Sequence, residues 1–227
     1  MSTRWTDPAG MPRRLTRRTR LWAEFTGFFV LAPLAMALLL PPMLMFPMLF
    51  LVSAIGLVLL HVTEGFDWPE LRYGLRDIDW RFVAGFTLVT LAVCLSVMLA
   101  LRPDGLFALA RQNPLRMAMI IALYPLASAL PQELVYRPLF FRRYGALLPG
   151  LKPALVLNAA AFSLAHLMYW SWIVAAMTFF GGLAFAWSYE ARRNFPQAVL
   201  LHAIAGWLIF TFGLGIYFYS GNVQRPF

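Results

Sequence analysis

The sequence has 227 residues, of which 61% are hydrophobic and 13% charged, and its formal net charge is +9. Soluble domains carry about 25% charged residues, so the composition excludes an ordinary soluble domain. It also excludes a membrane β-barrel, whose strands alternate apolar and polar residues in segments of about ten. The expected fold is all-α: a polytopic transmembrane helical bundle of about seven spans.

Seven apolar stretches are candidate spans, and most approach the ~20 residues that a helix needs to cross the hydrocarbon core. In chain order they are Trp22–Leu40, Met43–Leu60, Phe82–Leu101, Pro114–Phe141, Pro153–Trp170, Trp172–Trp187 and Pro196–Tyr219. The sixth is short, and the fourth is too long for one straight crossing. Pro125, Pro131 and Pro138 are expected to kink or divide the fourth span, because each removes a backbone donor.

The chain is expected to comprise a basic tail, residues 1–20, and a single helical membrane domain, residues 21–227. The arginines of the tail place it in the cytoplasm by the positive-inside rule. Arg102, Arg111 and Arg116 fall on the outer side of this topology and fit the rule less well. A nucleic-acid partner, another use of such positive charge, is not expected, because no soluble domain is left to bind it. The expected surroundings are the lipid bilayer.

Four ionisable side chains lie well inside the expected spans: Glu133, Arg137, His166 and His202. A charged residue at the centre of a spanning helix costs roughly 2.5–3.5 kcal/mol on insertion, and such residues are functional candidates by default. Glu133 and Arg137 are four residues apart and therefore neighbours on one helical face. Each residue alone could serve helix packing. Together, on three spans, they are the groups that general acid–base chemistry uses.

Other polar residues accompany this set. Gln132 precedes the carboxylate and lies about 100° further round the helix. In the fifth span, Asn158, Phe162 and His166 recur at four-residue spacing and form one stripe.

In the seventh span, His202 and Gly206 lie one turn apart on a common face. Counting from the start of each span puts His166 roughly 10 Å deeper than His202. A tilted fifth span, or a start of that helix below the membrane surface on the cytoplasmic side, would remove this mismatch.

Three motifs occur in this order: "QELVYR" at Gln132–Arg137, "FSLAH" at Phe162–His166 and "HAIAG" at His202–Gly206. They resemble those of the type II CAAX prenyl endopeptidase and bacteriocin-processing family, called CPBP or Abi. Its pattern is Glu-Glu-x-x-x-Arg, Phe-x-x-x-His and His-x-x-x-Asn. The likeness covers about residues 114–216. It implies an intramembrane protease of glutamic type without a cofactor, acting on a peptide, prenylated protein or membrane protein. The expected location is a bacterial inner (plasma) membrane.

The resemblance assigns the site to Gln132, Glu133, Arg137, His166 and His202. In the family a Glu and a His activate water, and the third-motif His and Asn stabilise the oxyanion. Here Gln132 replaces the first Glu, the usual general base, and Gly206 replaces the Asn. An amide cannot accept a proton at neutral pH. Either the chemistry is redistributed, with Glu133 as base and Asn158 or Gln132 as donor, or the protein is a non-hydrolytic relative.

Three functions stay open. The first is an intramembrane endopeptidase, and the second is an inactive relative that binds a membrane partner or a peptide. The third is a proton-coupled transporter, because buried Glu, Arg and His also serve proton relays; no related halves support it. No metal is expected. A zinc variant would use Glu133, His166 and His202 as a His₂Glu set, but no HExxH-type helix supports it.

Overall fold

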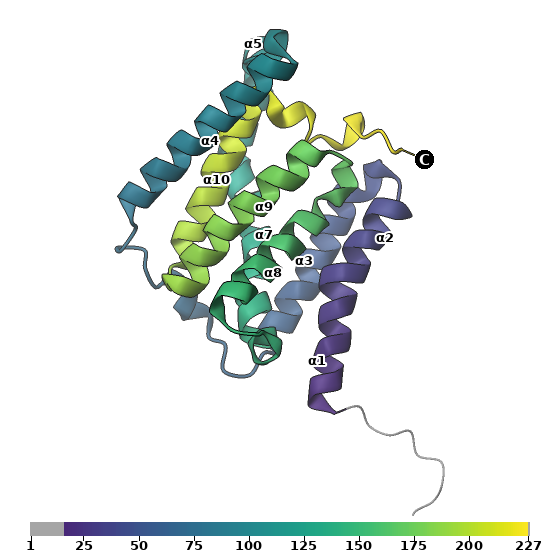
Figure 1. The fold of residues 1–227 in the computed structure, drawn as a ribbon, viewed down its shortest axis with the longest axis vertical. Helices are drawn as coiled ribbons and strands as arrows, with labels where there is room; N and C mark the ends of the chain where they lie inside the picture. Colours follow the sequence, from purple (N-terminus) through teal and green to yellow (C-terminus); the bar gives the residue numbers. More distant parts are fainter. Residues whose placement is uncertain (1–15, 227) are drawn as a thin grey trace, which may run out of the picture.

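The computed structural model describes residues 16–226, which form an all-α polytopic helical bundle (Figure 1). No β-strand occurs among these residues, so the expected fold class is confirmed. The α-helices are α1 (Arg17–Thr26), α2 (Ala32–Leu38), α3 (Met45–His61), α4 (Trp80–Leu101), α5 (Ala108–Gln112), α6 (Pro114–Tyr124), α7 (Leu130–Leu134), α8 (Leu151–Ala165), α9 (Trp172–Ala186) and α10 (Phe195–Thr211). Most of the expected basic tail, residues 1–15, lies outside the described residues.

Six helical stretches are long and apolar enough to cross a membrane. They are Arg17–Leu38, Pro42–His61, Trp80–Leu101, Pro114–Arg143, Leu151–Tyr169 and Trp172–Ala191. The seventh expected span is the shorter α10, with 17 residues. It ends at Thr211 rather than Tyr219, and Gly213 follows with a φ of +94°. Glycine adopts this left-handed conformation without a Cβ penalty and commonly ends helices.

The fourth span is a single helical stretch in which α-helix alternates with wider π-helical turns. The segments Pro125–Ala129 and Val135–Arg143 are π-helical, and α7 lies between them. Its prolines open the first segment, lie in the first turn of α7 and lie inside the second segment: Pro125, Pro131 and Pro138. A proline removes one N–H and crowds the carbonyl four residues before it, whereas π-turns bond residues five apart. The prolines therefore coincide with altered helical geometry but do not divide the span.

Aromatic side chains fix the first span against the π-helical end of the fourth. The ring centroids of Phe25 and Phe29 lie 5.4 and 5.1 Å from that of Phe140. Phe29 also lies 5.5 Å from Tyr136, and all four side chains are buried. Aromatic rings bury large apolar areas and favour such edge-to-face contacts. The first span therefore packs against the helix that carries the first motif and fixes its position.

The helices α8, α9 and α10 lie beside the helix that carries the first motif. In Figure 1, α8, α9 and α10 run side by side, and α10 also packs against α4 and α6. A Cβ on Gly182 of α9 would lie 3.2 Å from the Cα of Ala159 in α8. Small residues permit this close approach of membrane helices. The second and third motifs, on α8 and α10, are thus brought beside the first.

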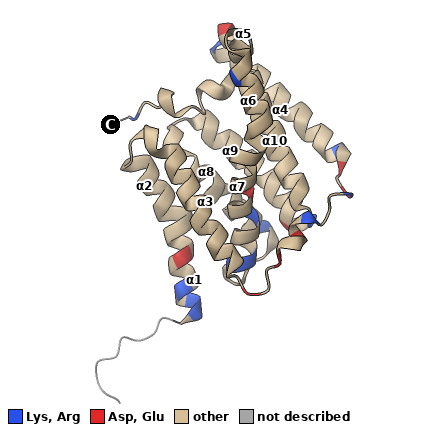
Figure 2. Ribbon diagram, turned by 180° about the vertical axis from the view of Figure 1, so that it is seen from behind, with Lys and Arg blue, Asp and Glu red and all other residues tan. Residues whose placement is uncertain are grey.

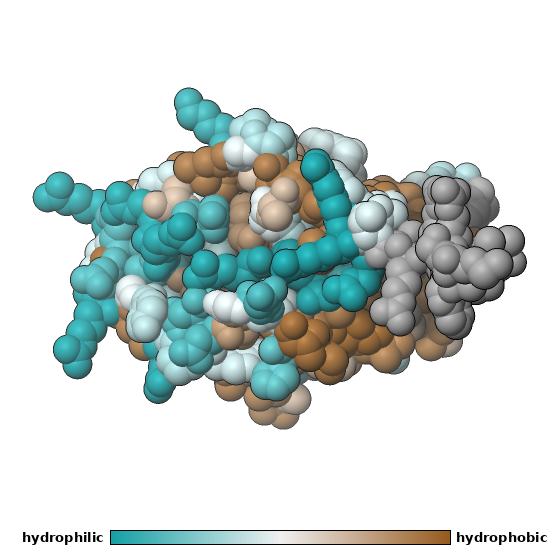
Figure 3. Space-filling view, turned by 90° about the horizontal axis from the view of Figure 1, so that it is seen from below, coloured by the Kyte–Doolittle hydropathy of each residue, from teal (hydrophilic) through white to brown (hydrophobic). Residues whose placement is uncertain are grey.

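Charged residues gather at the two ends of the bundle, and the main exception between them lies around α7 (Figure 2). At the end where α1 begins, four acidic residues each pair with an arginine distant in sequence: Glu24 with Arg143 at 2.7 Å, Glu64 with Arg17 at 3.0 Å, Glu70 with Arg142 at 2.7 Å, and Asp79 with Arg192 at 3.1 Å. Hydrophilic side chains spread across this end (Figure 3). A pair as exposed as Asp79–Arg192 contributes about 1 kcal/mol or less, whereas Glu24–Arg143 is more buried.

Candidate functional site

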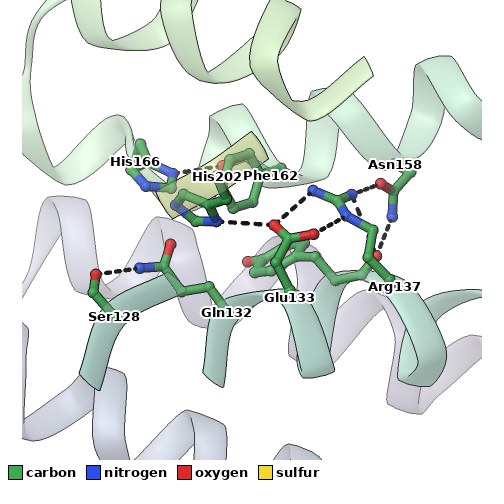
Figure 4. Close-up of polar contacts among 9 residues, drawn as sticks. Ser128, Gln132, Glu133, Arg137, Asn158, Phe162, His166 and His202 are labelled. Atoms are coloured by element: carbon green, nitrogen blue, oxygen red, sulfur yellow. Dashed lines mark hydrogen bonds and ion pairs between the residues drawn. The ribbon is translucent and has the colours of Figure 1, made fainter. Parts of the chain in front are cut away.

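Glu133 and Arg137 form a buried ion pair where α7 meets the π-helical segment that follows it (Figure 4). Arg137 Nε donates to Glu133 Oε2 at 2.8 Å, and Nη2 donates to Oε1 at 3.3 Å. Both side chains have 0% exposure. Buried charges persist in proteins when they are paired and hydrogen-bonded. The contact expected from the four-residue spacing is therefore present.

The rest of the Arg137 guanidinium is bound by α8. Its Nη1 donates to Asn158 Oδ1 and, at 3.4 Å, to the Tyr136 carbonyl oxygen. Asn158 Nδ2 donates to the same carbonyl at 2.6 Å. The rings of Phe162 and Phe185 lie 5.2 and 5.7 Å from Arg137 Cζ, within cation–π range. Asn158 is fully buried and holds Arg137, so it is not placed to donate to a substrate.

His202, in the middle of α10, is held by the same carboxylate. Its Nδ1 lies 2.9 Å from Glu133 Oε1. An ionised carboxylate can only accept, so Nδ1 carries the proton, and Nε2 of the neutral ring is an acceptor. The Phe185 ring stacks on the imidazole at a centroid distance of 5.0 Å and an angle of 10°. The ring is thereby fixed in one orientation and one tautomer.

His166 lies just after α8 ends, and its ring is fixed from within its own motif. Nδ1 lies 2.8 Å from the Phe162 carbonyl oxygen, to which it donates, so its Nε2 is also free to accept. The Phe162 ring contacts both imidazoles, at centroid distances of 4.7 Å for His166 and 5.5 Å for His202.

The depth mismatch expected between the two histidines is therefore absent. In Figure 1, α8 begins nearer the lower end of the bundle than α10 does. The longer distance along α8 thus agrees with the contacts of both imidazoles with the Phe162 ring.

Gln132 points away from the ion pair, as its position on the helix requires (Figure 4). Its Nε2 donates to Ser128 Oγ at 3.0 Å. One N–H and the amide oxygen of Gln132 remain available for other partners.

A largely apolar cavity of 1510 Å³ opens beside these residues. Of the polar site residues predicted from the sequence, Gln132, His166 and His202 line the cavity, whereas Glu133 and Arg137 do not. Two imidazoles and one amide therefore face the space that a ligand would fill. The ion pair lies on the side of His202 away from the cavity, and its carboxylate holds the imidazole by a hydrogen bond.

Tyr124 and Ser128, which precede the first motif in the same span, also line the cavity. The sequence-based prediction did not include them. The signal was nevertheless present, because Tyr124, Ser128 and Gln132 recur at four-residue spacing and so share one helical face. The proximity of Tyr124 to His202, whose ring centroids lie 6.0 Å apart, is a feature that the sequence alone could not supply.

Within residues 16–226, no group of three or more His, Cys, Asp or Glu side chains is arranged to hold a metal ion. Both oxygens of Glu133 already accept from Arg137, and one also accepts from His202. The zinc ligand set considered from the sequence is therefore not assembled in this structure.

Comparison with known proteins gives one match. Residues 114–208 match the family model described as Type II CAAX prenyl endopeptidase Rce1-like. No curated protein and no solved structure matches the chain. The matched stretch contains all three motifs and every site residue described above, which confirms the resemblance seen in the sequence. With its apolar helices of spanning length, the chain is an integral membrane protein whose residues 114–208 are similar to the type II CAAX prenyl endopeptidases.

Proposed function

We propose that the protein is an intramembrane endopeptidase in which His202, held by Glu133, activates water for attack on a peptide bond. One observation carries the proposal: His202 Nδ1 lies 2.9 Å from a buried carboxylate oxygen while the same ring lines a large cavity. A base oriented by a third group is the arrangement that hydrolytic sites use to activate a nucleophile.

The proposed chemistry uses the free nitrogen of His202. As the water oxygen bonds to the peptide carbonyl carbon, His202 Nε2 takes a water proton and the carbonyl electron pair moves to its oxygen. Glu133 stabilises the imidazolium that forms, because the carboxylate remains beside Nδ1. When the tetrahedral intermediate collapses, the C–N bond breaks and the proton passes to the leaving nitrogen.

The other cavity residues have supporting roles. Gln132 cannot take a proton, but its amide oxygen and second N–H can orient the attacking water. His166 presents a second accepting nitrogen to the cavity and can relay the proton to the leaving amine. Arg137 does not reach the cavity and acts by holding Glu133 ionised beside His202.

The cavity favours a peptide or membrane-protein substrate, prenylated or not, because its wall is mostly apolar and the described helices have spanning length. We place the end of the bundle that carries Arg142, Arg143 and Arg192 in the cytoplasm, together with the chain's amino terminus, by the positive-inside rule. A bacterial inner membrane is the proposed location.

Gln132 supports a second candidate function. It lines the cavity at the position where the family pattern has a carboxylate. If no other group serves as base, the cavity would bind a peptide or membrane partner without cleaving it. The two functions predict different results when a carboxylate is restored at position 132: the endopeptidase should gain activity, whereas the binding protein should not.

We expect Gln132→Glu to raise kcat at least tenfold, because a positioned carboxylate base contributes about 10²–10⁴-fold. The variant should fold normally, since Ser128 can donate to the new carboxylate in place of accepting from the amide. The measurement is cleavage of a fluorogenic panel of peptides, prenyl peptides and transmembrane peptides by purified protein in nanodiscs. Gln132→Met, of similar size but without a carboxylate, is the matched control and should not gain activity.

Cleavage by neither the wild type nor well-folded Gln132→Glu would contradict the endopeptidase. Peptide binding without turnover, measured by tryptophan fluorescence, would then support the binding function.

A further inference from the structure

Tyr124, the last residue of α6, lies beside the proposed catalytic group. Its ring centroid is 6.0 Å from that of His202, in an edge-to-face arrangement. The side chain lines the cavity, and its hydroxyl interacts with the Ser128 side chain. No sequence motif described above includes this tyrosine.

The Tyr124 ring occupies the space above Gly206. A Cβ built on Gly206 would lie 2.1 Å from Tyr124 Cε1 and 2.3 Å from Cζ. Real Cβ contacts do not occur at such distances, so any other residue at position 206 would displace the ring. Gly206 is one helical turn after His202. The phenol therefore fills the volume that a side chain beside His202 would otherwise take.

The phenol group of Tyr124 also lies where a hydrogen-bond donor on a side chain at position 206 would otherwise be. The hydroxyl oxygen is one bond beyond Cζ, so the phenol group and any side chain at position 206 would compete for the same space. The family pattern has an asparagine there, with an oxyanion-stabilising role.

The hydrogen bonds around Ser128 leave the phenolic proton of Tyr124 available to donate to a ligand. Ser128 Oγ accepts from Gln132 Nε2 at 3.0 Å, and its own proton can be donated to the Tyr124 oxygen. The Tyr124 proton can then be directed into the cavity.

We propose that Tyr124 is the oxyanion donor of this site, replacing a side chain at position 206; the inference rests on the proposed endopeptidase function. As water adds to the peptide carbonyl, the carbon–oxygen π pair becomes a lone pair on oxygen, and the phenolic O–H donates a hydrogen bond to it. The proton stays on Tyr124 and the carbonyl re-forms when the C–N bond breaks. Fixed donors in a site that excludes water stabilise such an oxyanion strongly.

Tyr124→Phe tests the donor while keeping the ring on Gly206. We expect kcat to fall about 10²–10³-fold, the usual effect of removing one oxyanion donor. KM and the melting temperature should change little, because the ring contacts with His202 and Gly206 remain. A purely space-filling tyrosine would give unchanged kcat in this variant, and that result would overturn the inference.

A position exchange supplies the matched control. Tyr124→Ala should lose activity, and Gly206→Asn alone should be destabilised because the new side chain meets the ring. The double variant Tyr124→Ala with Gly206→Asn removes the clash and places an amide donor in the vacated space. Its kcat should be at least tenfold higher than that of Tyr124→Ala. No recovery in a folded double variant would count against the donor role.

Binding of a peptide phosphonate separates this inference from the proposed function. Its tetrahedral anion mimics the water adduct, and binding needs no turnover. We expect Tyr124→Phe to weaken phosphonate binding at least tenfold while binding of the matching uncleaved peptide stays within twofold. Cleavage by the wild type together with unchanged phosphonate affinity in Tyr124→Phe would overturn the oxyanion role alone. No cleavage and no phosphonate binding, in the wild type and in Gln132→Glu, would overturn both proposals.

Discussion

Replacing Arg137 with alanine is expected to lower the free energy of unfolding by about 3–5 kcal/mol, the usual effect of leaving one partner of a buried ion pair uncompensated. Three groups lose a donor in this variant: the Glu133 carboxylate, the Asn158 amide oxygen and the Tyr136 carbonyl. All three residues are buried, so water cannot replace the guanidinium easily. Thermal and denaturant unfolding in detergent, followed by tryptophan fluorescence, would measure the loss.

Arg142→Ala is the matched control for this experiment. Arg142 also pairs with a glutamate, Glu70, but its side chain is 38% exposed, against 0% for Arg137. Its loss should cost about 1 kcal/mol or less. Equal effects of the two substitutions would show that the buried pair does not stabilise the bundle.

A second variant separates lost charge from lost volume. Arg137→Met combined with Glu133→Leu removes both charges and keeps two large side chains. Apolar replacements of buried ion pairs are often neutral for stability, so the double variant should be more stable than Arg137→Ala. It should have no hydrolytic activity, because His202 then lacks its carboxylate.

His202→Gln is expected to reduce kcat by about 10⁴-fold, because it removes the only imidazole bound to the buried carboxylate within residues 16–226. Stability should fall much less than in Arg137→Ala, since Glu133 keeps both contacts with Arg137. The measurement is single-turnover cleavage of the best peptide in the panel, with the melting temperature recorded in parallel.

Groups that act as a unit give non-additive losses. If Glu133 acts through His202, the double variant His202→Gln with Glu133→Gln should be no slower than His202→Gln alone. An additional large loss in the double variant would instead assign Glu133 an independent role as base. Activity close to the wild type in folded His202→Gln would contradict the proposed mechanism.

Much of the fold was predictable from the sequence because the bilayer imposes simple rules. Continuous apolar runs require helices, since unpaired backbone groups are too costly in lipid. The Glu133–Arg137 contact followed from four-residue spacing, and Asn158, Phe162 and His166 do form one stripe toward the site. These features depend on helical periodicity, which the sequence expresses directly.

Other features depend on how helices sit against one another. The sequence did not indicate that the carboxylate would lie behind His202, out of the cavity, because that depends on the packing of α7 against α10. Nor did it indicate which residue fills the space over Gly206. Counting residues put His166 deeper than His202, and the lower start of α8, which removes this mismatch, is not encoded in the local pattern.

The composition of the cavity wall has a consequence for turnover. Hydrolysis has two substrates, and the second is water, which each catalytic cycle consumes. A wall of phenylalanine, leucine, isoleucine and methionine offers water few hydrogen bonds, and buried water needs polar partners. Around the proposed site those partners are Tyr124, Ser128, Gln132, His166 and His202, and other polar side chains, among them Arg102, Asp104 and Arg116, also line the wall. In the proposed reaction, the apolar side chains that would hold the peptide and the polar side chains that would hold water are different groups on the same wall, and we expect the supply of water to the polar residues around His202 to limit the rate once the peptide is bound.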